Sequence, residues 1–220
     1  MARDPDGRRP ALVHTQVPMP KKQPTSATTG RRFMRERARK HPPFVHAVLA
    51  DAQCACSNLG RDVGNATRYR LALEAARLTL VSDAFIGLVL YRCKARLEAF
   101  GIPVLPHLAH RLAIATAGVS IGTPVLIEAG IYLPHGQVVV DGFVEVGAGT
   151  AIRPWVTIGL LEGMFEGPKI GRKVRIGTGA KILGPVTIGD RALIGANAVV
   201  MRDVPSGATA VGAPARVIET

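Results

Sequence analysis

The stretch IGRKVRIGTGAKILGPVTIGDRALIGANAVVMRDV, residues 170–204, carries a six-residue repeat that decides the fold. An aliphatic residue recurs at every sixth position from Ile170 to Val200, and a small or β-branched residue follows four positions after each. A hexapeptide period is typical of a parallel β-helix, in which each hexad supplies one short strand and one corner. We therefore expect a triangular prism with the aliphatic side chains stacked inside it.

The same period extends upstream to Ile121, with two irregularities. The step from Leu133 to Val140 is seven residues, so one residue is inserted in the segment that contains His135. Residues 159–169, GLLEGMFEGPK, lack the pattern, and we interpret them as a loop that leaves the prism at a corner. A pair of poorly patterned strands is the alternative. Long loops in compact repeats usually carry function.

Composition and charge bound the class of protein. Of the 28 Lys and Arg residues, eleven lie in residues 1–40, together with only three of the sixteen Asp and Glu residues. Such a basic segment, rich in Pro, Ser and Thr, is typical of a solvated tail, and this interpretation disfavours a nucleic-acid partner. Contact of residues 1–40 with RNA or anionic lipid is the alternative. The chain has neither an apolar run long enough to span a bilayer nor an apolar N-terminal signal, which predicts a cytoplasmic protein.

The predicted fold class is α+β, a helical N-terminal domain followed by a left-handed parallel β-helix built of hexapeptide repeats. The expected divisions are a disordered basic tail (1–30), a helical domain (31–117) and the β-helix (118–220), which includes the loop at 159–169 and a C-terminal tail. Helical periodicity predicts helices over residues 44–57, 66–81, 83–100 and 103–117. Ser82 is the expected N-cap of the third helix.

The three cysteines, Cys54, Cys56 and Cys93, all precede the repeat. An odd count without a secretion signal argues against a disulfide framework. Cys54 and Cys56 could combine with His41 and His46 in a metal site, but their spacing matches no zinc pattern. We predict buried free thiols and no metal.

His135 is the candidate catalytic residue. It is the only histidine after His110, it lies at the insertion that breaks the repeat, and Leu133 and Val140 account for the inward positions around it. A neutral imidazole is a competent general base near neutral pH. A structural or solvated role for a lone histidine is the alternative.

Several motifs carry a resemblance to a known family: VTIG (156–159), PKIG (168–171), GAPARVI (212–218), the His135–Gly136 pair and LVLYR (88–92). With them, the chain resembles the hexapeptide-repeat acyltransferases and, more narrowly, the serine acetyltransferases. The resemblance implies transfer of acetyl from acetyl-CoA to the hydroxyl of a small acceptor, by family default L-serine in cysteine biosynthesis. It also implies a homotrimer or a dimer of trimers with CoA in the groove between subunits.

The resemblance assigns roles to individual residues. His135 would deprotonate the acceptor hydroxyl, which attacks the thioester without an acyl-enzyme. The residues implied in CoA binding are Gly159, Thr178, Ala196, Lys181 and Arg216.

The sequence departs from the family pattern around the acceptor. Pro134 stands where the family has an Asp, Ser120 replaces the Asp that orients the imidazole, and Gly167 replaces a second His. Asp141 or Glu145 is our candidate for the orienting acid. These departures make a saccharide or secondary-metabolite hydroxyl a rival acceptor, and an inactive scaffold is a further alternative. A zinc carbonic anhydrase of this fold needs several histidines, whereas the repeat has one.

Overall fold

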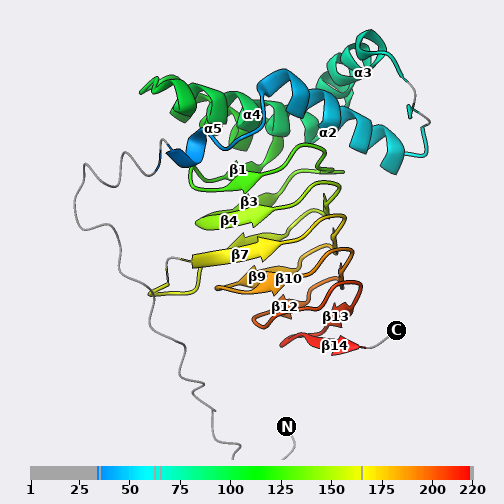
Figure 1. Ribbon diagram of the computed structural model, residues 1–220, viewed down its shortest axis with the longest axis vertical. Helices are drawn as coiled ribbons and strands as arrows, with labels where there is room; N and C mark the ends of the chain where they lie inside the picture. Colours follow the sequence, from blue (N-terminus) through cyan, green and yellow to red (C-terminus); the bar gives the residue numbers. More distant parts are fainter. Residues whose placement is uncertain (1–33, 35, 62, 65, 165, 219–220) are drawn as a thin grey trace, which may run out of the picture.

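The computed structural model describes residues 34–218 except residues 35, 62, 65 and 165. The predicted basic tail at 1–30 lies outside these residues. The described part comprises a layer of helices stacked on one end of a three-sided prism of β-strands (Figure 1). This is the predicted fold class, a helical domain followed by a left-handed parallel β-helix.

The helical layer contains α2 (Phe44–Asn58), α3 (Arg68–Val81), α4 (Phe85–Phe100) and α5 (Leu105–Ala117). The helices predicted from periodicity are therefore present, with starts that differ by up to two residues. The predicted N-cap is wrong, because Ala84 is the N-cap of α4 and Ser82 is the C-cap of α3. None of the helices among the described residues is long and apolar enough to cross a membrane.

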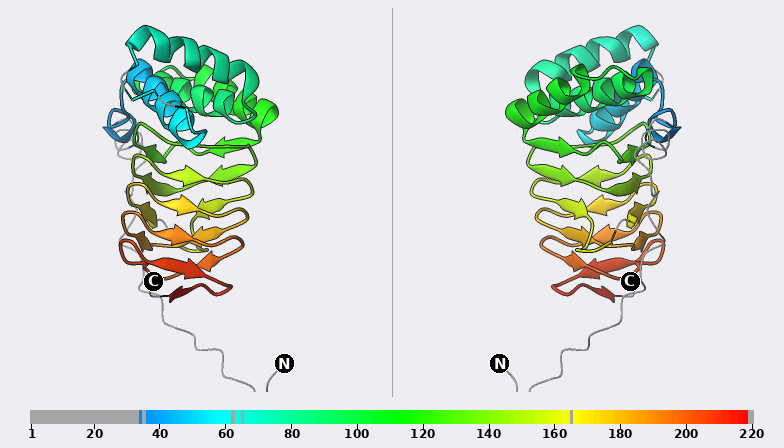
Figure 2. Two further views of the ribbon diagram at one scale, coloured as in Figure 1. Left: turned by 90° about the vertical axis from the view of Figure 1, so that its right-hand side faces the viewer. Right: turned by 90° about the vertical axis from the view of Figure 1, so that its left-hand side faces the viewer.

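The prism has three faces, here sheets 1, 2 and 3, whose strands stack in parallel from coil to coil (Figure 2). Sheet 1 contains β1 (Val119–Ile121), β3 (Val138–Val140), β6 (Thr157–Gly159), β9 (Lys181–Leu183) and β12 (Val199–Val200). Sheet 2 contains β2 (Leu126–Ile127), β4 (Phe143–Val146), β7 (Glu166–Ile170) and β10 (Thr187–Ile188). Sheet 3 contains β5 (Ala151–Ile152), β8 (Arg175–Ile176), β11 (Leu193–Ile194), β13 (Thr209–Val211) and β14 (Arg216–Ile218), the last antiparallel to β13.

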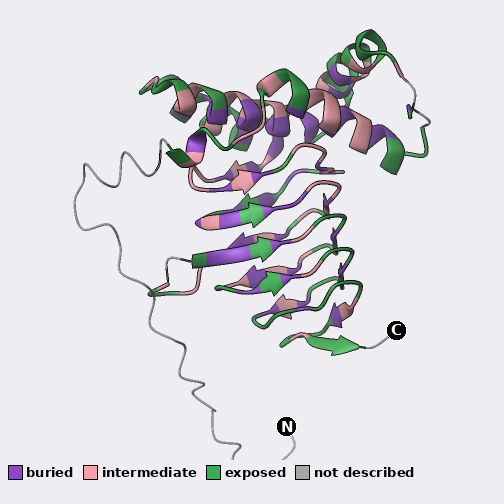
Figure 3. Cartoon of the chain, in the orientation of Figure 1, coloured by how far each residue is buried: buried purple, intermediate pink, exposed green. Residues whose placement is uncertain are grey.

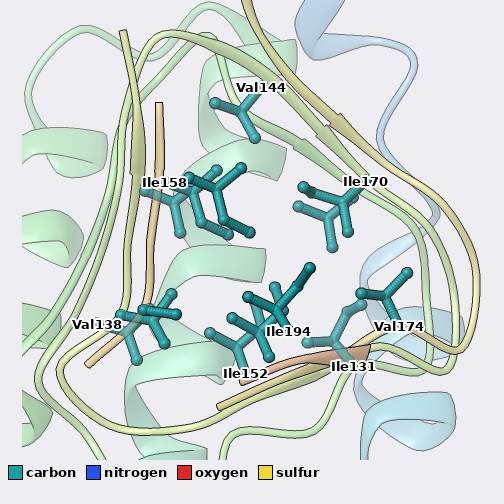
Figure 4. Close-up of a cluster of buried hydrophobic side chains, with 14 of the residues drawn as sticks. Ile131, Val138, Val144, Ile152, Ile158, Ile170, Val174 and Ile194 are labelled. Carbon is teal, nitrogen blue, oxygen red and sulfur yellow. The ribbon is translucent and has the colours of Figure 1, made fainter. Parts of the chain in front are cut away.

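The register of the strands superimposes the repeat residues. Ile121 pairs with Val140, and Val140 with Ile158. The side chains of each column point into the prism, as Figure 4 shows for Ile158, Ile170 and Ile194 among others. Buried and exposed residues alternate along the strands (Figure 3). The interior is filled by aliphatic side chains because the six-residue period returns one of them to the inside in every strand.

The predicted loop at 159–169 is only partly a loop. Gly159 ends β6, and β7 begins at Glu166, where it pairs with Phe143 of β4. Gly167 and Pro168 are buried within β7, so the strand is longer than the repeat pattern indicates. The register of β4 and β7 shifts between Phe143 and Glu145, where β7 contains one more residue than β4.

A buried polar network attaches the helical layer to the first coil. The guanidinium of Arg92 contacts both carboxylate oxygens of Asp51 at 2.9 and 3.1 Å, and it donates to the carbonyl oxygens of Ile127 and Glu128. Asp51 also accepts from the backbone N–H groups of Gly130 and Ile131. Because α2, α4 and the first coil share this network, the helical layer is held in a fixed position above the prism.

Candidate active site

His135 lies on the edge of the prism where sheet 3 leads into sheet 1, here called the 3–1 edge. Its neighbours Leu133 and Val138 are buried in the core, and Gly136 is buried beside the end of α5. A Cβ atom on residue 136 would collide with the carbonyl oxygen of Ala117. Glycine is therefore required for this close approach. The backbone of this corner packs against the end of α5, whereas the imidazole lies on the surface of the prism with 63% of the side chain exposed.

The imidazole has a carboxylate partner from the helical layer. Nδ1 of His135 lies 2.8 Å from Oδ2 of Asp83, in the turn between α3 and α4. A neutral imidazole that donates from Nδ1 to a carboxylate has an unprotonated Nε2. This arrangement leaves Nε2 free to accept a proton from a hydroxyl group.

A cleft of about 400 Å³ lies beside this pair, between the helical layer and the first coil. Apolar walls come from Phe85 and Leu133, and polar groups from Ser82 and Tyr132. Two guanidinium groups, those of Arg61 and Arg77, also line it, and both pair with the single carboxylate of Glu74 at 2.9 and 3.4 Å. The cleft can therefore admit a small polar molecule next to His135.

The two candidates for the acid that orients His135, Asp141 and Glu145, have other surroundings within the single chain. Glu145 lies on sheet 2 and pairs with Arg37 at 3.3 Å. Asp141 follows β3 and packs against Gly122, while His135 precedes β3. Because β3 lies between them, Asp141 and His135 are at different edges of the triangular prism. Sequence reasoning missed Asp83 because it lies 52 positions upstream in another layer.

The predicted CoA contacts are distributed over two edges. Thr178 and Ala196 lie in successive corners of the 3–1 edge, below His135. Gly159 ends β6 on the opposite side of sheet 1, and Arg216 is exposed in β14. Lys181 donates from Nζ to the carbonyl oxygens of Trp155 and Gly179, at 2.8 and 3.0 Å, so its ammonium group lies along the same edge as His135.

The 3–1 edge also carries an aromatic side chain that sequence reasoning did not select. Trp155, the single tryptophan of the chain, occupies the corner of the coil below His135 and is 61% exposed. Its backbone has a φ of 65°, and its N–H donates to the carbonyl oxygen of Gln137. A bulky residue in the left-handed region is uncommon and marks a constrained corner. The one signal in the sequence that could have identified it is that it is the sole tryptophan of the chain.

Cys54, Cys56 and Cys93 are free thiols, but only Cys56 is buried, whereas Cys54 and Cys93 are half-buried. Burial, followed by the charge of Asp51, raises the pKa of Cys54 to about 11, and burial also raises the pKa of Cys56. These groups are therefore poor nucleophiles at neutral pH. Among the residues that the structure describes, no three His, Cys, Asp or Glu side chains cluster closely enough to hold a metal ion.

Comparison with known proteins places the chain in a family. Residues 167–202 match the family described as bacterial transferase hexapeptide (six repeats), and residues 113–134 match the hexapeptide repeat of succinyl-transferase. A serine acetyltransferase of Helicobacter pylori strain J99 is 38% identical over 136 residues, which cover 60% of this chain and 79% of that protein. The chain belongs to the serine acetyltransferase family.

Solved structures of the same family share the fold. The serine acetyltransferase of Neisseria gonorrhoeae in complex with serine superimposes with a TM-score of 0.68 at 27% identity, covering 85% of this chain and 74% of that one. A serine acetyltransferase in complex with CoA gives the same TM-score and identity, over 85% of this chain and 75% of that one. These alignments cover 85% of this chain, so both its helical layer and its prism have counterparts in the solved serine acetyltransferases.

Proposed function

We propose that this protein is an acetyl-CoA-dependent O-acetyltransferase that acetylates L-serine, as a step in cysteine biosynthesis. Family membership supports acetyl transfer, and the relatives solved with serine and with CoA support the two substrates. The observation that carries the proposal for this chain is the exposed imidazole of His135, held by Asp83 at the mouth of a cleft.

The reaction follows from the free Nε2 of His135. It takes the proton of the acceptor hydroxyl, while the hydroxyl oxygen bonds to the thioester carbonyl carbon. When the tetrahedral intermediate collapses, the carbon–sulfur bond breaks and the thiolate of CoA takes the proton from the imidazolium. Backbone N–H groups of the corner would stabilise the oxyanion. No acyl-enzyme is required, which agrees with the absence of cysteine from residues 94–220.

CoA is assigned to the 3–1 edge, with its extended arm running past Thr178 and Ala196. Small side chains at these corners allow backbone contact with the pantetheine arm. Lys181 and Arg216 supply positive charge for its phosphates. Gly159 lies away from His135 within a single chain. We therefore propose that it contacts CoA bound at the His135 edge of a neighbouring subunit. We infer a homotrimer or a dimer of trimers, working in the cytoplasm.

Release of the CoA thiol tests the proposal. Purified protein is mixed with acetyl-CoA and L-serine, and the free thiol and O-acetylserine are both quantified. Serine-dependent release with matching O-acetylserine is expected. Binding of CoA without transfer to any hydroxyl acceptor would overturn the proposal and favour an inactive scaffold.

A saccharide or secondary-metabolite hydroxyl is the second candidate acceptor. It is favoured by Pro134 and Gly167, which stand where the family has polar acceptor-binding side chains, so the chain has lost groups suited to an amino acid. Amino sugars and other polyols are included in the same thiol assay. If their kcat/KM exceeds that of L-serine, the acceptor assignment changes while acetyl transfer stands.

A further inference from the structure

We propose that Asp83 is the positioning residue of the active site, and that the helical layer thus supplies the acid that orients the catalytic imidazole. This inference rests on the proposed function of His135. Its observation is the 2.8 Å contact between Nδ1 of His135 and Oδ2 of Asp83. The carboxylate fixes the tautomer in which Nε2 is the base and limits rotation of the ring.

Both side chains project from rigidly held backbone. The residues that follow Asp83, Ala84 and Phe85, are 0% and 3% exposed. Gly87, one turn further along α4, packs so closely that an added Cβ would lie 2.9 Å from Val119 of β1. On the other side, Leu133 and Gly136 hold the corner that carries His135. The separation of the two side chains is therefore set by the packing of α4 on the first coil.

The carboxylate of Asp83 does not serve its own helix. Acidic residues just before a helix commonly accept hydrogen bonds from the first backbone N–H groups. Here Ala84 is the N-cap of α4, and no side chain caps the helix. Asp83 instead contacts an imidazole 52 residues away. A role in the site explains this choice of partner, whereas a role in starting α4 does not.

The pair contributes little to folding, which makes the proposal testable. The side chains of His135 and Asp83 are 63% and 71% exposed. A side-chain pair at such exposed positions typically contributes little to stability. Variants of Asp83 should therefore fold, and changes in rate can be attributed to the site.

The kinetic test compares Asp83→Asn, Asp83→Ala and Asp83→Glu with the parent protein, using the acceptor that the parent acetylates best. The Asn and Ala variants should lose about ten- to a hundredfold in kcat, because an unoriented imidazole forfeits part of the contribution of the general base. KM for acetyl-CoA should stay within twofold, and Glu should recover part of the rate. Asp203→Asn is the matched control, because Asp203 is exposed and accepts from the backbone N–H of Thr187. Parent-like kcat in Asp83→Ala would overturn the proposal.

A spectroscopic test separates this inference from the proposed function. Imidazole ¹⁵N shifts of His135, assigned by comparison with His135→Gln, report which nitrogen carries the proton. The neutral ring should be protonated at Nδ1 in the parent and should become a mixture of tautomers in Asp83→Asn. An unchanged tautomer would refute positioning by Asp83, whatever acceptor the enzyme uses. Absence of acetyl transfer by a parent that shows the expected tautomer would refute the proposed function instead.

Discussion

At the scale of single residues, Gly136 determines how the corner at His135 is built. Replacing it with Ala would press a methyl group against the carbonyl oxygen of Ala117. We expect Gly136→Ala to lower the free energy of unfolding by about 1–3 kcal/mol, as is typical of overpacking. Urea denaturation measures this change. Gly159→Ala is the control, since its nearest neighbour would be the carbonyl oxygen of Asp141 at 3.8 Å, and an equal loss there would contradict the steric explanation.

His41 makes stability depend on pH. Burial, followed by the charges of Arg92 and Lys94, lowers its pKa from 6.5 to about 4. Between these values the unfolded chain binds a proton that the folded chain does not. Stability is therefore full above about pH 6.5 and falls as the pH drops toward 4, by roughly 2–3 kcal/mol.

The measurement is urea denaturation at several pH values for the parent and for His41→Gln. The variant should lose less stability between pH 7 and pH 4.5 than the parent. Parallel pH profiles for the two proteins would show that another group is responsible. His46→Gln, at an exposed position of α2, serves as the comparison.

Residue patterns predicted the core but only half of the candidate site. The aliphatic period identified the inward residues because each hexad repeats one local geometry, and Val174, Ala180 and Ala198 are all fully buried. His135 was detectable as an interruption of this period. Asp83 was not, because its contact arises from how α4 docks on the first coil, which no local pattern encodes. Asp141 and Glu145 are close to His135 in the sequence, but a strand or a change of sheet separates each of them from it in the fold.

At the scale of elements, the pair of Asp51 and Arg92 joins α2 and α4 to the first coil. Both side chains are nearly inaccessible, at 1% and 2% exposure. Asp51→Ala would leave a buried guanidinium without its carboxylate, and we expect a loss of about 3–5 kcal/mol in unfolding free energy.

Denaturation of the single variants and of Asp51→Leu combined with Arg92→Met checks this. The double variant should be more stable than Asp51→Ala, because it buries no unpaired charge. If the double variant is the least stable of the set, the loss reflects packing volume rather than the unpaired charge. A variant that shifts the helical layer relative to the prism should also have a lower kcat, because that layer carries Asp83.

Element boundaries were predictable where capping and periodicity agreed and failed where packing prevailed. The end of α4 at Gly101 followed from its glycine, which has a φ of 76°. The start of β7 did not follow, because Gly167 and Pro168 are poor strand formers that tertiary pairing with β4 brings into the sheet.

At the scale of the whole molecule, the proposed CoA groove is completed by neighbouring subunits. The chain has a mass of 23.3 kDa, so sedimentation should show species of about three or six times that mass. Activity per subunit should fall on dilution as the assembly dissociates. A monomer with full acetyl transfer would contradict the inferred assembly.

In the proposed mechanism, the imidazole of His135 is the general base. The most direct test of this role is the single-turnover rate of acetyl transfer in His135→Ala with acetyl-CoA saturating. His107→Ala, which removes an exposed imidazole from α5, is the control. We expect the rate to fall by about 10²- to 10⁴-fold in His135→Ala with acetyl-CoA binding retained, and to remain parent-like in His107→Ala. A parent-like rate in His135→Ala would contradict the proposed mechanism.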